Sequence, residues 1–221
     1  MSICVVGGSG AQGSGLALRW AYAGHKVTIG SRDENKAKEA ASELNAILGD
    51  NRIVGMESAK GAAEASIIVL TVPYFSQVAT VNGLKDHLAG KILIDVTVPL
   101  VPPKVSTAQL PETDSCVVNI QKMLGPSVRV VSAFQNVSAH KLKKLDYAID
   151  CDVLVACDDK AAREVGIALA KDAGLRGIDA GPLANSVVAE SLTSALIWIN
   201  RKYKVPDAGI RITGLDAAAP Q

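Results

Sequence analysis

The sequence has few aromatic residues and no excess of charge of either sign. Phe, Trp and Tyr make up 4% of the 221 residues, which disfavours β-sandwiches and base-stacking nucleic-acid platforms. The 23 Lys and Arg residues balance 22 Asp and Glu residues, so no electrostatic surface for nucleic acid or membrane is expected. Hydrophobic residues make up 48%, which excludes disorder. The composition predicts a dense globular protein rich in Val, Ile, Leu and Ala.

Long hydrophobic runs and paired cysteines are also missing. No stretch of about 18 apolar residues occurs, and residues 1–6 lack the basic start of a signal peptide. We therefore expect a cytoplasmic protein without a membrane partner. The four cysteines form no C-x-x-C pair and lie near no histidine cluster, so no metal site is expected. They are predicted to be reduced, buried thiols: Cys4, Cys116, Cys151 and Cys157.

Short Val/Ile-rich runs alternate with helical patterns along most of the chain. This alternation predicts an α/β fold with a doubly wound, mostly parallel sheet and helices on both faces. Strands are expected near residues 2–6, 26–30, 67–71, 91–95, 128–132, 152–156 and 175–179. Helices are expected over residues 16–23, 33–48, 160–173 and 186–201. The length fits one domain with a small C-terminal extension of the sheet.

A glycine-rich motif follows the first predicted strand and precedes a helix. It matches G-x-G-x-x-G: Gly8-Ser9-Gly10-Ala11-Gln12-Gly13. In this setting Gly8 would permit a tight turn, Gly10 would let the backbone approach a pyrophosphate, and Gly13 would let the helix pack closely. N–H groups at the helix start would face the anion. The alternative is a glycine turn that binds nothing, but the strand–turn–helix position favours a Rossmann-type dinucleotide site.

The end of the second predicted strand indicates which dinucleotide is bound. An NAD site usually has an acidic residue there, whereas this chain has Ser31 and Arg32. The Ser31 hydroxyl can donate to a 2′-phosphate, the Arg32 guanidinium can bind it, and Lys36 supplies a second cation one turn further on. A cation is unfavourable at the positive end of a helix, so a purely surface role for Arg32 and Lys36 is the weaker interpretation. The sequence predicts a preference for NADP(H).

Two further segments leave the predicted sheet at its carboxyl edge, where doubly wound folds bind ligands. After Pro73, Tyr74 is placed to lie against the nicotinamide end of the cofactor and Val78 against its ribose, although a turn proline followed by a capping aromatic explains the spacing equally well. Four prolines in residues 96–113 predict an ordered loop beside the site. Asp95 is expected to satisfy backbone donors and to take no part in the chemistry.

No catalytic side chain can be assigned from spacing. Neither a Ser-His-Asp nor a Cys-His arrangement can be assembled, and His140 has no carboxylate or nucleophile predicted beside it. The expected set of catalytic residues is therefore empty.

Several segments together resemble the NADPH-dependent reductases of the deazaflavin coenzyme F420. The most specific is Asp179 to Ser186, followed by Glu190-Ser191-Leu192. The others are Gly7 to Gly10 with Gly13, Gly30-Ser31-Arg32 with Lys36, Leu70 to Pro73, and Ser132 to Val137. The resemblance implies hydride transfer between NADP(H) and F420. Direct transfer between two bound cofactors needs position and exclusion of water, which agrees with the empty set of catalytic residues. The alternatives are an NADPH-dependent imine or small-carbonyl reductase, which would require a proton donor such as His140 or Tyr74, and a non-catalytic regulator that senses NADP(H).

The resemblance also implies site residues and an organisation. Cofactor contacts in that family fall on Ser9 to Gln12, Ser31, Arg32, Lys36, Tyr74, Val78, Ala139 and, less surely, Ala208. It implies an NADP-binding Rossmann domain over residues 1–145 and a smaller segment over 146–221 that completes the deazaflavin pocket and a homodimer contact. The predicted helix at 186–201 has apolar residues on more than one face, as a helix covered on two sides requires.

Overall fold

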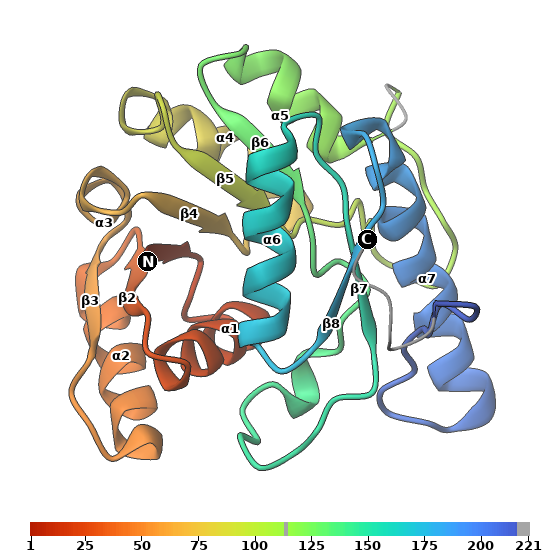
Figure 1. The fold of residues 1–221 in the computed structure, drawn as a ribbon, viewed down its shortest axis with the longest axis horizontal. Helices are drawn as coiled ribbons and strands as arrows, with labels where there is room; N and C mark the ends of the chain where they lie inside the picture. The colour runs from red at the N-terminus through yellow and green to blue at the C-terminus, as the bar shows by residue number, and fades with distance from the viewer. Residues whose placement is uncertain (113–114, 216–221) are drawn as a thin grey trace.

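A computed structural model describes residues 1–112 and 115–215, and six parallel strands form its main sheet (Figure 1). The strand order is β3-β2-β1-β4-β5-β6, which is that of a Rossmann fold. The strands are β1 (Ser2–Val6), β2 (Lys26–Ser31), β3 (Ile53–Glu57), β4 (Ile67–Leu70), β5 (Ile92–Asp95) and β6 (Arg129–Ser132). The central strands are buried on both faces, so they carry continuous Val/Ile/Leu runs. The predicted fold class is confirmed.

Helices cover both faces of this sheet. One face is covered by α1 (Ala11–Tyr22), α2 (Glu34–Leu48) and α6 (Lys160–Asp172), and it holds a core that includes Trp20, Ile94 and Leu169. The other face is covered by α3 (Ser58–Glu64), α4 (Tyr74–Leu84) and α5 (Cys116–Leu124), around Leu70 and Leu93. In the described part of the chain, no helix combines the length and apolarity needed to cross a membrane.

Four of these elements have no counterpart among the sequence-based expectations. They are β3, α3, α4 and α5. β3 lies at the edge of the sheet and contains Gly55, where a Cβ atom would collide with the backbone of Ala37 in α2. Helix α3 has only seven residues. Short elements such as these have too few residues to produce a clear hydrophobic period.

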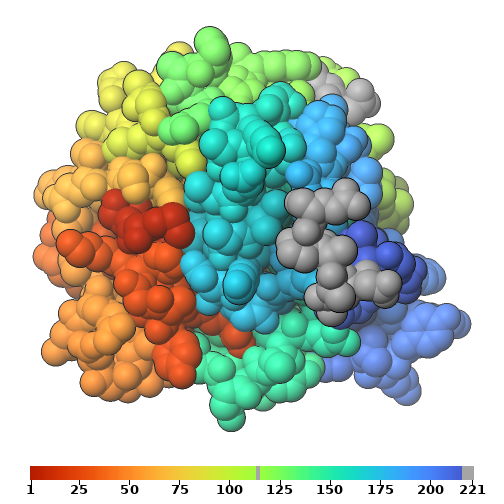
Figure 2. All heavy atoms as spheres, viewed as in Figure 1, coloured from red at the N-terminus to blue at the C-terminus, as the bar shows by residue number. Residues whose placement is uncertain are grey.

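The C-terminal part adds a smaller unit on the β6 side. β7 (Asp152–Val155) and β8 (Arg176–Asp179) form a separate two-stranded parallel sheet. It meets β6 through one antiparallel bridge between Ser132 and Ala156, so the predicted extension of the main sheet is limited to this bridge. The hydrophobic core nevertheless continues from α1 into β7 and α6, and the two parts of the chain meet without a gap on the face seen in Figure 2.

Helix α7 (Ser186–Tyr203) buries polar as well as apolar side chains. Val188 and Trp198 are exposed, whereas Glu190 and Ser194 are buried. Glu190 reaches the start of α5, where its carboxylate accepts hydrogen bonds from Ser115 Oγ at 2.6 Å and from the Cys116 N–H at 3.0 Å. A buried carboxylate with such donors replaces apolar packing, and it fixes α7 against α5.

Candidate functional site

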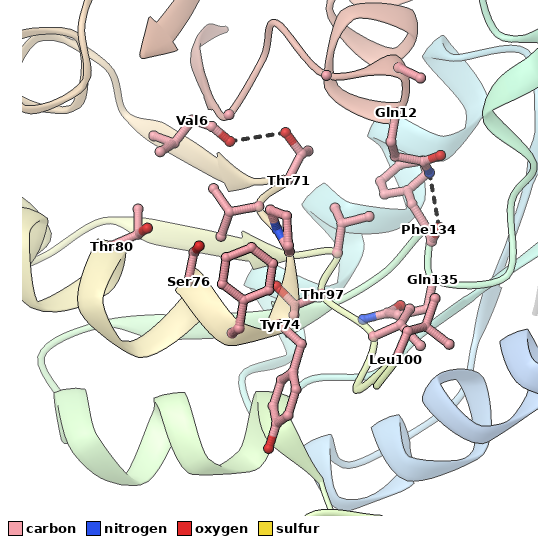
Figure 3. Close-up of a pocket in the computed structure, with 18 of the residues that line it drawn as sticks. Val6, Gln12, Thr71, Tyr74, Ser76, Thr80, Thr97, Leu100, Phe134 and Gln135 are labelled. Carbon is pink, nitrogen blue, oxygen red and sulfur yellow. Dashed lines mark hydrogen bonds between the residues drawn. The ribbon is translucent and has the colours of Figure 1, made fainter. Parts of the chain in front are cut away.

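A cavity of about 700 Å³ lies at the carboxyl edge of the sheet, near the boundary between β1 and β4. At this boundary the order in which the chain adds strands to the sheet changes direction. Doubly wound folds bind their ligands at this switch point. The cavity is lined by the glycine loop, the end of β2, the start of α4, the loop after β5 and the segment after β6 (Figure 3). Seven of the predicted site residues are among its lining: Ser9, Gly10, Ala11, Gln12, Ser31, Arg32 and Tyr74.

The glycines of the loop have separate structural roles. Gly7, with φ +77°, provides the left-handed residue of the turn, and Gly8 lies in the same tight turn. A Cβ on Gly8 would lie 2.7 Å from the Val5 carbonyl oxygen and would strike Ile29. A Cβ on Gly13 would lie 2.8 Å from Gly8 Cα and would collide with Thr71 Oγ1. The close contact of α1 with the strand ends therefore depends on Gly8 and Gly13.

Gly10 is different because its free side faces the cavity. An added Cβ would meet only the Gly7 carbonyl oxygen, at 3.4 Å. Gly10 caps α1, and no protein group of the described chain accepts from the N–H groups of Ala11, Gln12 and Gly13. These donors and the positive end of the helix dipole are available to an anion. The geometry fits the predicted pyrophosphate site.

Ser31 and Arg32 lie where β2 ends at the rim of the cavity. Ser31 Oγ accepts a hydrogen bond from the Asp33 N–H at 3.2 Å, which leaves the hydroxyl proton free to be donated. Arg32 is exposed and makes no ion pair or hydrogen bond with any described residue. Asp33 instead caps α2 by accepting from the Asn35 and Lys36 N–H groups. The guanidinium is therefore not neutralised by a neighbouring carboxylate.

Besides Gly8 and Gly13, four predicted contacts do not line the cavity: Lys36, Val78, Ala139 and Ala208. Lys36 is exposed on α2, and Val78 is 51% exposed on α4. Tyr74 lines the cavity but points away from the glycine loop, toward the lower helices in Figure 3. Burial raises the pKa of Tyr74, and Cys116 and Glu190 add to this effect. Its hydroxyl therefore stays protonated.

Ala139 and Ala208 lie outside the lining but are held close to each other. Ser138 Oγ donates to Asp207 Oδ1 at 2.9 Å, and Lys141 forms an ion pair with the same carboxylate at 2.9 Å. These contacts bring together two segments that the resemblance implicated separately. Ser138 directly follows Val137, which lines the cavity.

The predicted loop after β5 forms one wall of the site. Over the described residues 96–112 it has no regular secondary structure, and Val96, Thr97, Leu100 and Pro102 line the cavity. Asp95 precedes it and is fully buried. Its carboxylate accepts from the Thr97 N–H at 2.9 Å and from Gln77 Nε2 at 2.6 Å, as the expected structural role requires. Burial raises the pKa of Asp95 to about 6.

The opposite wall contains functional candidates that sequence reasoning missed. Phe134 has a φ of +71°, which is a strained conformation for a bulky residue, and its ring packs edge to face against Trp20. Its carbonyl accepts from Gln12 Nε2 at 3.2 Å. Gln135 follows it and is 4% exposed while lining the cavity, together with Thr193 of α7. A glutamine 122 residues from the glycine loop gives no local signal of such a position.

The remaining reactive groups lie outside the cavity or are inert. All four cysteines are free and buried, and burial raises the pKa of Cys4 to about 12, so thiolates are disfavoured. His140 is exposed in a short 3-10 helix and does not line the cavity. The described residues contain no group of three or more His, Cys, Asp and Glu side chains that could hold a metal.

The fold and the site define a dinucleotide-binding oxidoreductase-type protein, and comparisons with known proteins identify its family. Residues 2–99 match the family described as NADP oxidoreductase coenzyme F420-dependent. The F420-dependent NADP reductase of Methanocaldococcus jannaschii is 41% identical, over 98% of this chain and 100% of that protein. The enzyme of the same name from Methanothermobacter thermautotrophicus is also 41% identical, over 97% and 96%.

A solved structure agrees with these relatives. A crystal structure of a candidate F420-dependent NADP reductase from Arthrobacter sp. FB24 has a TM-score of 0.80 and 28% identity, covering 96% of this chain and 99% of that one. The chain belongs to the F420-dependent NADP reductase family. The family resemblance inferred from the sequence motifs is thereby confirmed.

Proposed function

We propose that this protein transfers a hydride between NADP(H) and the deazaflavin coenzyme F420. The observation that carries the proposal is 41% identity over nearly the whole chain to three enzymes named F420-dependent NADP reductase. The cavity at the switch point supports it, because it joins a glycine loop to a second region between the β5 loop and α7. When both cofactors are bound, they supply the hydride donor and the acceptor.

The glycine-loop end of the cavity would bind NADP(H). The free N–H groups at the start of α1 would hold the pyrophosphate, with Gly10 allowing close approach. Ser31 and Arg32 would bind the 2′-phosphate, since neither is committed to a neighbouring charge. Gly8 and Gly13 would act through packing. Lys36, Val78, Ala139 and Ala208, which do not line the cavity, are proposed as outer contacts of the cofactor.

The other end of the cavity would hold the deazaflavin ring. The residues that line this end are Val96, Thr97, Leu100, Gln135 and Thr193. The protein's part in the reaction is to place two planar rings in contact and to exclude water between them. No side chain of the described chain needs to exchange a proton with the carbon that receives the hydride, which fits the exposed position of His140.

The organisation is part of the same proposal. Residues 1–145 would form the NADP-binding domain, and residues 146–215, with the undescribed end of the chain, would complete the deazaflavin pocket and a homodimer contact. The exposed Val188, Trp198 and Tyr203 on α7 support this contact, because large apolar side chains favour a partner surface. A cytoplasmic location is supported by the four free, buried thiols.

The deciding experiment mixes the purified protein with NADPH and oxidised F420. Loss of the visible absorbance of the deazaflavin, matched mole for mole by NADPH oxidation, is the expected result. Tight NADPH binding without turnover would replace the proposal by a sensing role. Turnover of imines or small carbonyls, but not of F420, would favour the reductase alternative, and loss of that turnover in Tyr74→Phe would identify the proton donor.

A further inference from the structure

A buried amide in the wall of the cavity has an oxygen with no hydrogen-bond partner. Gln135 is 4% exposed, and its Oε1 atom contacts no donor among the described residues. Burying a carbonyl oxygen without a donor costs free energy, and most buried polar atoms in proteins are paired. Gln135 also lines the cavity, so a molecule bound there would lie against this side chain, and a small movement of neighbouring side chains would open the buried Oε1 atom to its donor.

The orientation of this amide is fixed by its other atom. Gln135 Nε2 donates to the main-chain oxygen of Asp95 at 2.8 Å and lies 2.9 Å from Ser132 Oγ. A carbonyl oxygen can only accept, so the amide nitrogen must face Asp95, and a flipped amide would place two acceptors together. The unpaired atom of Gln135 is therefore the acceptor Oε1.

The backbone that carries Gln135 is held from both sides of the cavity. Thr193 Oγ1 donates to the Gln135 carbonyl oxygen at 2.8 Å, and Gln12 Nε2 donates to the Phe134 carbonyl oxygen at 3.2 Å. Phe134 keeps its strained φ of +71° because its ring is fully buried. Strained residues persist where the surroundings enforce them, often at ligand sites. The acceptor is thus rigidly placed before any ligand binds.

We propose that Gln135 Oε1 accepts a hydrogen bond from the amide-type N–H of a ring bound in the cavity. This inference rests on the proposed function, which supplies two such donors: the imide N–H of the deazaflavin and the carboxamide N–H of nicotinamide. The deazaflavin is favoured, because Gln135 and Leu100 lie on the side of the cavity away from the glycine loop (Figure 3). A buried acceptor of this kind discriminates against ligands that lack the donor.

The test combines a protein change with a ligand change. Gln135→Met keeps the length of the side chain but removes the acceptor, and Gln121→Met is the matched control. Gln121 also has a hydrogen-bonded amide, but its donors and acceptor are all paired outside the cavity. Dissociation constants are measured for four molecules: F420, its analogue methylated at the imide nitrogen, NADP⁺, and the analogue with 3-acetylpyridine in place of nicotinamide.

The expected result is an approximately tenfold weaker binding of F420 by Gln135→Met, with Gln121→Met unchanged. Wild type should prefer F420 to the methylated analogue, and Gln135→Met should lose most of this preference. If Gln135→Met instead binds NADP⁺ more weakly and loses the preference for NADP⁺ over its acetylpyridine analogue, the donor is the nicotinamide carboxamide. In either case the effect of the residue change depends on whether the ligand carries the N–H. A general loss of stability would not produce that dependence.

Equal affinity of Gln135→Met and wild type for both natural cofactors would overturn the inference. If Gln135→Met does not fold, the wild-type protein decides, because unchanged binding of both analogues would also overturn it. The proposed function fails separately, when wild type neither binds F420 nor oxidises NADPH with it. The NADP⁺ measurements on Gln135→Met remain informative in that case, because binding is measured without turnover.

Discussion

Gln12 in the glycine loop donates a hydrogen bond from Nε2 to the main-chain oxygen of Phe134, at 3.2 Å. This contact joins the start of α1 to the segment after β6, so the two ends of the cavity are held in register (Figure 3). Gln12 and Phe134 are 122 positions apart in the sequence and belong to different segments of the cavity lining. The binding of the two cofactors is therefore expected to depend on a contact that need not involve either of them directly.

Replacing Gln12 by methionine tests this connection. The variant removes one hydrogen bond of the neutral class, worth about 0.5–1.5 kcal/mol. We expect the KM for both NADPH and F420 to rise by roughly two- to tenfold, because both walls shift. Equilibrium unfolding should change by less than about 1.5 kcal/mol, since Gln12 is only half-buried. A rise in the KM for NADPH alone would mean that Gln12 contacts that cofactor and does not couple the walls.

The two alanine variants Gly10→Ala and Gly13→Ala should separate binding from folding. A Cβ on Gly10 enters the cavity and meets only the Gly7 oxygen, so we expect nucleotide affinity to fall at least about tenfold with stability within about 1 kcal/mol of wild type. A Cβ on Gly13 collides with Thr71 and Gly8, so unfolding should become easier by about 1–3 kcal/mol. Calorimetry and nucleotide titration measure the two effects. Normal affinity in Gly10→Ala would contradict the placement of the pyrophosphate.

The buried carboxyl of Asp95 should give the protein an unusual pH dependence. Its pKa is raised from 3.8 to about 6 by burial, so the folded state takes up a proton at higher pH than the unfolded state does. This group therefore adds stability as the pH falls from about 6 toward 4, and the buried charge is unfavourable at pH 7. Between pH 7 and pH 5 the gain is on the order of 1 kcal/mol.

Asp95→Asn is the comparison for this prediction. The asparagine keeps an acceptor for the Thr97 N–H, and Gln77 can rotate its amide to accept from the new NH₂ group. The difference in unfolding free energy, wild type minus variant, should become more positive on going from pH 7 to pH 5. Denaturant titrations at the two pH values measure it. A difference that stays constant would show that Asp95 titrates at its ordinary pKa in the fold.

The elements that the sequence predicted well are those whose signals are local. β1, β2 and the glycine turn before α1 follow from a continuous apolar run and a short motif, and Ser31 and Arg32 follow from their distance to it. The burial of Glu190 in α7 could not be predicted, because its hydrogen bonds to Ser115 and Cys116 are supplied only by the tertiary fold.

The second half of the site had no local signal. Gln135 acquires its position from Asp95, Ser132 and Thr193, which come from β5, β6 and α7. The strained backbone of the preceding residue also has no sequence signature, since bulky residues rarely adopt a positive φ. The motif typical of phosphate-binding loops was therefore recognisable, whereas the wall that would face the second substrate required the structure.

The choice of cofactor should depend on Arg32. Its guanidinium is exposed and unpaired among the described residues. A charge-assisted contact with the 2′-phosphate would therefore stabilise the complex without breaking an existing ion pair. Arg32→Ala should weaken NADP(H) binding by about 1.5–3 kcal/mol, a roughly ten- to hundredfold loss, while NADH, which lacks that phosphate, should be almost unaffected.

The double variant Ser31→Asp, Arg32→Ala extends the same argument. An aspartate at position 31 repels the phosphate and offers an acceptor to the ribose hydroxyls, so the double variant should prefer NADH. The measurement is the ratio of kcat/KM for NADPH and NADH in wild type and in both variants. Lys38→Ala serves as a control, because it removes a cation of α2 that is already paired with Glu34. If efficiency with NADPH and NADH falls together in Arg32→Ala, the arginine serves the fold or the shared pyrophosphate, and the predicted preference for NADP(H) loses its main support.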